Sequence, residues 1–161
     1  TNLFWLAPTI SSIVLTVFII RVSAKQKNLQ KEQNEIQKQN VKLALFDKRL
    51  KIYTRVREFI AMVISDSSCT MKDVNDFHHD CREAILLFED DVYYYVDELR
   101  KKGKSLSLLK SKENKSLVDK EFIKRSEIID KQEVIIDWFT QQLSESVEIF
   151  DRYLNVNKLG L

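Results

Sequence analysis

The sequence predicts an all-α protein with a single N-terminal transmembrane helix followed by an antiparallel bundle of three long helices. We expect the bundle to run up, down and up with coiled-coil-like packing. Three observations predict this fold. The first twenty residues carry no charge, and the 161 residues include only two Gly and one Pro to interrupt helices. Apolar residues also recur every seven positions in two separate stretches of the chain.

Residues 1–24 are predicted to form a membrane anchor. From Leu3 to Ile20 the residues are mostly Leu, Ile, Val, Phe and Trp. At about 1.5 Å per residue, a helix of this length spans roughly the 30 Å hydrocarbon core of a bilayer. A cleaved signal peptide would carry basic residues ahead of a shorter apolar core, and a buried soluble helix would be amphipathic. The anchor is therefore the favoured interpretation.

Basic residues predict the direction of this helix. No Lys or Arg lies within Thr1–Ile20, whereas several follow it: Arg21, Lys25, Lys27, Lys31 and Lys38. The positive-inside rule then predicts that the N-terminus lies outside and the C-terminal domain lies in the cytoplasm. Ser12 and Thr16 are small polar residues four positions apart, which can let another membrane helix approach closely. Alternatively, both hydroxyls bond to carbonyls of their own helix.

Composition argues against several classes of function. The chain has 26 basic and 24 acidic residues, so its net charge of +2 indicates no nucleic-acid partner. Two cysteines fit a reducing compartment better than a disulfide framework. The sequence holds no glycine-rich phosphate loop, no Ser/His/Asp set and no HExxH motif. We expect no enzyme activity, no cofactor and no small-molecule substrate.

The first helix is predicted to run from the membrane to about Ser65, and its N-terminal part, 25–42, reads as a polar stalk. The bundle then covers 43–157 and a short tail covers 158–161. Leu29, Ile36, Leu43 and Leu50 recur every seven residues, as in a coiled-coil seam. In the stalk, the apolar residues of this seam are surrounded by Gln, Asn and Lys. From Leu43 onward, apolar residues follow one another at closer spacing along the seam.

The second and third helices complete the predicted bundle. The second begins after an N-cap at Asp73, passes through Gly103 and ends near Lys110. Residues 112–116 form the predicted turn. The third helix carries a seven-residue repeat and ends near Asn155; the repeat consists of Phe122, Ile129, Ile136, Leu143 and Phe150. Short turns make neighbouring helices antiparallel, which would return the second turn to the membrane.

Two candidate surfaces follow from this arrangement. Lysines near the second turn are candidates for lipid-headgroup contact, or form an ordinary solvated basic helix end. They are Lys101, Lys102, Lys104, Lys110, Lys112 and Lys115. Tyr93 and Tyr94 are candidates for a protein-partner surface, because exposed aromatic residues often anchor interfaces. Their neighbour Tyr95 is expected in the core.

Metal binding is the weakest candidate. His78, His79, Cys69 and Cys81 have metal-ligating chemistry, but their spacing does not match a zinc site. Adjacent histidines on a helix also point about 100° apart. We expect Cys81 to be a small core residue instead.

One segment carries a resemblance. Residues 45–53 read LFDKRLKIY, which resembles an "LF(D/E)KR…Y" helix of uncharacterised bacterial membrane-anchored helical proteins. The resemblance covers about 42–106. It implies an inner-membrane protein with a cytoplasmic helical domain, and it implies no activity. Phe46, Leu50 and Tyr53 share a helix face, and Arg49 beside them is expected to pair with Asp90 or Glu98.

These observations predict a non-catalytic single-pass membrane protein that presents a helical bundle for protein–protein interaction or self-assembly. One alternative is a membrane-acting effector, in stress or phage defence, whose transmembrane helix oligomerises to permeabilise the membrane. The other alternative is a metal-binding helical protein.

Overall fold

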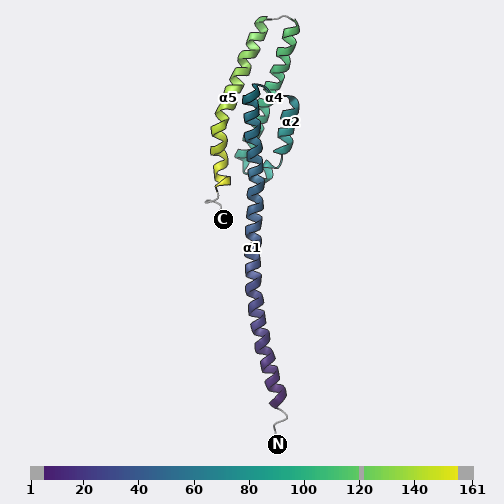
Figure 1. The fold of residues 1–161 in the computed structure, drawn as a ribbon, viewed down its shortest axis with the longest axis vertical. Coiled ribbons are helices and arrows are strands. Elements are labelled where there is room, and N and C mark those ends of the chain that lie inside the picture. The colour runs from purple at the N-terminus through teal and green to yellow at the C-terminus, as the bar shows by residue number, and fades with distance from the viewer. Residues whose placement is uncertain (1–5, 120–121, 156–161) are drawn as a thin grey trace. The chain divides into compact units, whose positions relative to one another are not determined.

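The computed structural model describes the backbone of residues 6–119 and 122–155, and the side chains of residues 16, 18–115 and 125–155. The described residues contain helices and connections but no strand, which confirms the all-α prediction (Figure 1). The helices are α1 (Leu6–Asp66), α2 (Met71–Asp80), α3 (Ala84–Leu87), α4 (Asp90–Asp119) and α5 (Phe122–Leu154).

The chain divides into two compact units, Thr1–Leu43 and Ala44–Leu161, and the division falls inside α1. Where side chains are described, no helix is both long enough and apolar enough to cross a membrane. The predicted anchor, 1–24, lies largely outside that description, because the side chains of residues 1–15 and 17 are not part of it. From Phe18 to Leu43 every side chain is exposed.

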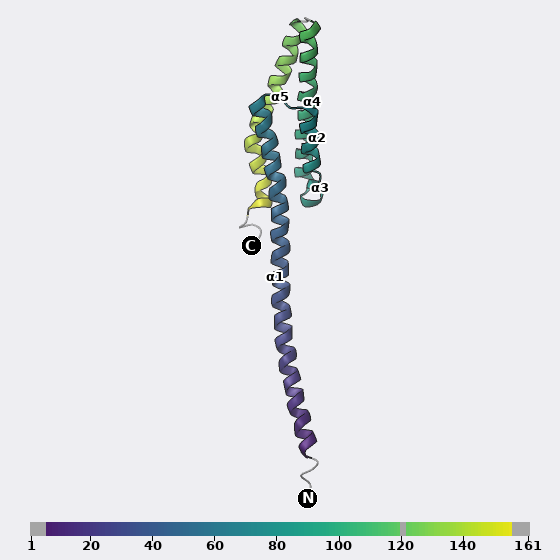
Figure 2. The ribbon, with the colours of Figure 1, turned by 45° about the vertical axis from the view of Figure 1, so that its right-hand side comes forward.

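The second unit has four helical passes. The ring of Phe59 on α1 stacks on that of Phe77 on α2, with centroids 4.2 Å apart. Nearer the N-terminus of α1, the Arg55 Nε donates to Asp80 Oδ2 at 2.6 Å, so α2 runs antiparallel to α1. Tyr53 contacts Phe150 on α5 at a centroid distance of 5.2 Å, which sets α5 antiparallel as well. Figures 1 and 2 show α4 running parallel to α1 within this unit.

The prediction of one helix from Asp73 to Lys110 was wrong, and with it the prediction of a three-helix, up-down-up bundle. The chain reverses between Asp80 and Asp90, with α3 inside the connection. This stretch holds no Gly or Pro to mark a break. Phe88 takes an extended backbone (φ −130°, ψ 171°), is 9% exposed and packs edge-on against Tyr153 at 5.0 Å. Here packing against distant residues overrides local helix propensity.

The predicted turn at 112–116 was also wrong, because α4 continues to Asp119. Figures 1 and 2 both show the α4–α5 hairpin extending past the C-terminal end of α1. The connection beside the start of this unit is instead 81–89, where Arg49 of α1 bonds to Leu87.

The C-terminal ends of α1 and α5 agree with the ends predicted from the sequence, whereas α2 starts earlier than predicted. The helix α1 ends at Asp66, one residue past the predicted end near Ser65, and Ser67 has a positive φ of 50°. The N-cap of α2 is Thr70, not Asp73. Thr70 Oγ1 accepts from the Asp73 amide at 3.2 Å, and the Asp73 carboxylate accepts from the Thr70 amide at 2.8 Å. This reciprocal pair is a capping box, so Asp73 stands at its third helical position.

The core of the second unit matches most of the predicted apolar stripes. Phe77, Val92, Leu99, Leu106, Phe139 and Phe150 are buried together with the α1 residues Val56, Phe59, Ile60 and Val63. Two residues of the predicted α1 seam, Leu43 and Leu50, are exposed instead, and so are the apolar residues Ile85 and Val147. Ile85 lies within the reversal, where the continuous helix predicted from Asp73 to Lys110 is broken.

Candidate functional site

The most distinctive surface of the first unit is an uncovered row of apolar side chains on α1. Val22, Leu29, Ile36 and Leu43 stand seven residues apart and are 46%, 51%, 57% and 52% exposed. A seven-residue spacing drifts by only about 20° per repeat on a straight helix, so the four side chains share one face. We call these four residues the stalk seam. Sequence reasoning found three of them and missed Val22.

The rest of the stalk surface is polar. The positions three residues after the first three seam residues are Lys25, Glu32 and Gln39. Val41 is an exception, with 69% exposure. At about 100° per residue it stands roughly 140° round the helix from Ile36. Val41 therefore provides an exposed apolar residue off the seam for comparison with the seam itself.

Arg49 has a structural role that the sequence did not reveal. Its Nε donates to the Leu87 carbonyl at 2.8 Å, and its guanidinium lies 5.6 Å from the Phe88 ring centroid and 5.3 Å from that of Tyr153. The expected pairing with Asp90 or Glu98 was wrong. Arg49 instead satisfies a carbonyl at the end of α3 and holds the reversal against α1 and α5.

A second polar cluster joins the start of α4 to the end of α5. The Tyr153 hydroxyl donates to Asp91 Oδ1 at 2.8 Å, and Arg152 pairs with both Asp91 and Glu89. Burial raises the pKa of the Tyr153 hydroxyl, and its donation to Asp91 raises it further. The sequence showed Asp91 only as part of an acidic run. The contact spans 62 residues, so no local signal could have revealed it.

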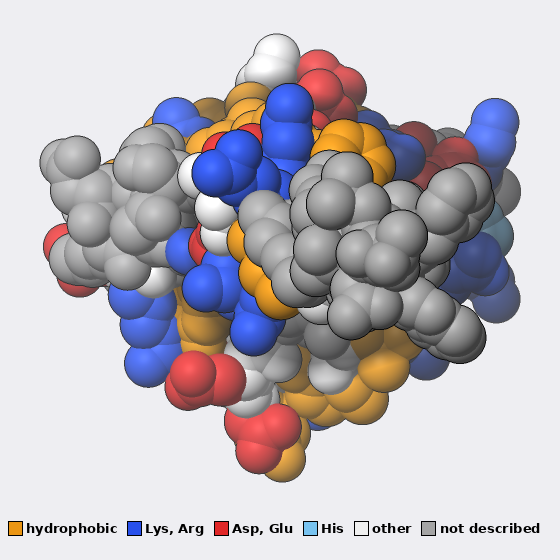
Figure 3. Space-filling view, turned by 90° about the horizontal axis from the view of Figure 1, so that it is seen from below, with side chains coloured by type: hydrophobic (Ala, Val, Ile, Leu, Met, Phe, Trp, Pro, Cys, Tyr) orange, Lys and Arg blue, Asp and Glu red, His pale blue; other side chains and the backbone are white. Residues whose placement is uncertain are grey.

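Three of the predicted headgroup lysines make contacts within the second unit. The Lys101 Nζ lies 2.7 Å from Asp97 Oδ2, and the Lys102 Nζ lies 5.3 Å from the Trp138 ring centroid. Basic, acidic and hydrophobic side chains are interspersed on the face drawn in Figure 3. Lys110 also pairs within this unit, with Glu113. Headgroup contact rested on a turn that lies elsewhere, and it stays a prediction for all six lysines.

Glu113 forms a buried polar cluster in the α4–α5 hairpin. Although only 7% exposed, its carboxylate accepts from Lys110 at 3.0 Å, Gln132 at 3.3 Å and Arg125 at 3.5 Å. The pKa of Glu113 is lowered, and the largest cause is the hydrogen bond that its carboxylate accepts from Lys110. These partners keep the buried carboxylate charged and satisfied. The Lys110 ammonium is therefore directed toward Glu113 within the same hairpin.

The three consecutive tyrosines differ in exposure as the sequence predicts. Tyr95 is 6% exposed and lies in the core, which confirms its assignment. Tyr93 and Tyr94 are 38% and 66% exposed, with ring centroids 5.5 Å apart. Their contact with a protein partner stays a prediction. Of the proposed membrane-helix contacts, the Ser12 side chain lies outside the described residues and Thr16 is exposed.

The metal candidates are separated by the fold. Cys69 and Cys81 are buried at 5% and 2% exposure, whereas His78 and His79 are exposed. The Cys69 thiol donates to the Gly103 carbonyl at 3.1 Å. Within the described residues, no three His, Cys, Asp or Glu side chains are grouped to hold a metal ion. The prediction that Cys81 is a core residue is confirmed.

Both thiols are expected to be unreactive in the folded protein. Burial raises the pKa of Cys69 to about 11 and that of Cys81 to about 12. At pH 8 the thiolate is then on the order of one part in a thousand or less, and the thiolate is the reactive form. We expect a thiol-reactive disulfide reagent to label neither cysteine rapidly at pH 8 and to label both in urea. Rapid labelling of the native chain would contradict this burial.

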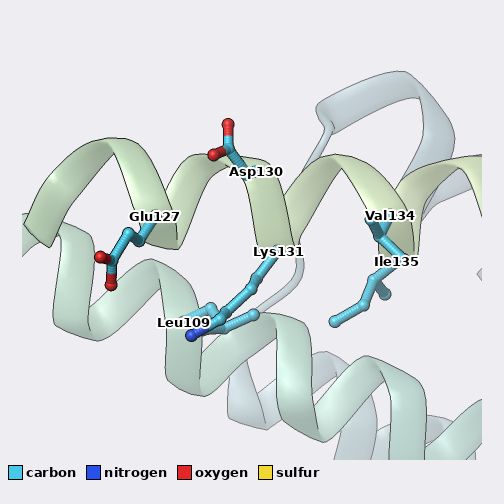
Figure 4. A pocket seen from close by; sticks show the side chains of 6 residues that line it. All are labelled: Leu109, Glu127, Asp130, Lys131, Val134 and Ile135. Carbon is cyan, nitrogen blue, oxygen red and sulfur yellow. The ribbon is translucent and has the colours of Figure 1, made fainter.

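A shallow groove lies between α4 and α5 in the hairpin. Leu109 contributes from α4, and the other lining residues come from α5: Glu127, Asp130, Lys131, Val134 and Ile135 (Figure 4). In this view the Lys131 side chain extends across the groove toward Leu109. Val134 is 68% exposed. Three apolar and three charged side chains line the groove, and sequence reasoning missed it because they come from two helices.

Searches of protein-family models, curated proteins and solved structures found no match to this chain.

Proposed function

We propose that this chain is a non-catalytic, single-pass membrane protein of the bacterial inner membrane that presents a cytoplasmic helical bundle for protein–protein contact, including self-assembly. The observation that carries the proposal is the stalk seam. Isolated apolar side chains are common on protein surfaces, but an apolar row at seven-residue spacing is the pattern of a helix that packs against another helix. The resemblance of residues 45–53 and the uncharged N-terminal run support the membrane location.

The polar side chains described above support the non-catalytic part of the proposal. Arg49, Asp91 and Glu113 each bond to groups that hold helices together. A general acid or base needs a group free to reach a substrate at a suitable pKa. These three side chains serve the fold instead, and the most prominent uncovered surface is apolar.

Membrane attachment is tested by fractionation of cells that express the full chain. We expect the wild-type chain to stay in the membrane pellet after alkaline carbonate washing. Ile10→Arg combined with Ile13→Arg should move it to the soluble fraction, because both residues lie near the middle of the Leu3–Ile20 run, where each charge costs about 2.5–3.5 kcal/mol. Val41→Ser, outside the uncharged run and off the stalk seam, is the matched control. A wild-type chain that carbonate releases would overturn the anchor.

The protein-contact role is tested by native mass spectrometry of the chain extracted in mild detergent. We expect either a homo-oligomer or a stoichiometric complex with a second protein. A monomer at all concentrations, also recovered as a monomer after crosslinking in intact cells, would overturn it.

A further inference from the structure

We propose that the stalk seam is the contact surface of a parallel, in-register homodimer, in which each seam residue packs against its equivalent in a second copy. This inference rests on the proposed function and names one partner for it. The seam residues are about half exposed on a helix that no other described element of the first unit covers. The occupant must therefore be a helix with the same seven-residue period.

The polar positions of the stalk select a parallel orientation. In a parallel in-register coiled coil, equivalent positions form the layers, so Leu29 meets Leu29 and Ile36 meets Ile36 of the second copy. In an antiparallel pair, the seam positions pack beside the positions three residues further on, which here are Lys25, Glu32 and Gln39. Only the parallel pair buries apolar side chains against one another.

Charge complementarity between flanking positions agrees with this register. In a parallel pair, the residue just before a seam position faces the one five residues later in the second copy. Lys42 then faces Asp47, an opposite-charge pair of exposed residues. Asn28 faces Gln33, and Glu35 faces the neutral residue at position 40. None of these facing positions carries two like charges.

The seam also sets the strength of the dimer. From Val22 to Leu43 it covers roughly three heptads, with one apolar position in each heptad where a full coiled-coil seam has two. Layers at Lys25 and Glu32 place like charges near each other, and this repulsion lowers the stability of the pair. The dimer is therefore weak in dilute solution. Attachment to one membrane raises the effective concentration of the two stalks and favours pairing.

Disulfide trapping tests the geometry in the full chain. A disulfide requires Cα atoms about 4.4–6.8 Å apart, which equivalent seam positions satisfy only in a parallel, in-register pair or at the single centre of an antiparallel one. We expect Leu29→Cys and Leu43→Cys, each tested alone, to yield a disulfide-linked dimer in oxidised membranes. The matched control, Val41→Cys, should yield at least five-fold less. The unmodified chain should yield none, since Cys69 and Cys81 are buried.

The outcomes separate this inference from the proposed function. Trapping at both seam positions but not at Val41 supports the parallel dimer. Equal trapping at Val41, or none at Leu29 and Leu43, overturns it. As a second measurement, Leu29→Ser combined with Ile36→Ser should weaken dimerisation in detergent at least ten-fold, whereas Val41→Ser should leave it unchanged. If oligomers or a complex with another protein persist unaltered in the double variant, the inference falls while the proposed function stands.

Discussion

Arg49→Ala is expected to lower the free energy of unfolding of the bundle by about 2–4 kcal/mol. A hydrogen bond from a charged donor contributes about 1.5–3 kcal/mol, and a cation over an aromatic face adds about 0.5–2 kcal/mol. Arg49 makes one such bond, to Leu87, and lies over two rings, those of Phe88 and Tyr153. Its loss leaves the Leu87 carbonyl unsatisfied at the point where the chain reverses.

The measurement is urea unfolding followed by Trp138 fluorescence in a Trp5→Phe background, so that the signal reports on the bundle alone. Lys48→Ala, at an exposed neighbour, is the control and should change the free energy by less than about 0.5 kcal/mol. Arg49→Lys should fall between the two, because an ammonium keeps the charge but not the planar stacking. A loss for Arg49→Ala no greater than that for Lys48→Ala would show that Arg49 does not hold the reversal.

Gly103→Ala is expected to destabilise the bundle, although alanine is the better helix former. A Cβ at this position would stand 2.8 Å from Phe59 Cζ and 3.3 Å from Val74 Cγ2. Overpacking costs typically about 1–3 kcal/mol, against the roughly 1 kcal/mol that alanine gains in propensity. We expect a net loss of up to about 2 kcal/mol for Gly103→Ala and a larger loss for Gly103→Val.

A double-mutant cycle identifies the cause. Phe59→Leu removes the atom that the new Cβ would meet, so the alanine penalty should shrink in that background by an interaction free energy of about 0.5–3 kcal/mol. Ser105→Ala, exposed on the same helix, is the control. An increase in stability for Gly103→Ala would indicate that α1 and α2 do not approach the α4 backbone closely.

Several features of the fold follow from local patterns in the sequence. The shortage of Gly and Pro indicated long helices, the Ser-rich run placed the end of α1, and the seven-residue repeat of 122–150 placed α5. Periodicity also identified most of the core, including Tyr95 and Cys81. Each of these signals depends on residues within a few turns of one another. Such patterns show which side of a helix is apolar, whatever packs against it.

The tertiary structure decided the rest, because the interactions responsible join residues far apart in the chain. The reversal at 81–89 carries no breaker residue, and it is held by Arg49 of α1 and by the contact of Phe88 with Tyr153 of α5. Gly103 looked like a weak point in a helix, yet it is where Phe59 and Val74 meet the backbone. Local patterns predicted α1, α5 and the apolar side of most helices, but not the division of residues 71–119 into α2, α3 and α4. Which of those faces became core, and which stayed uncovered as the stalk seam did, depended on packing that no local pattern records.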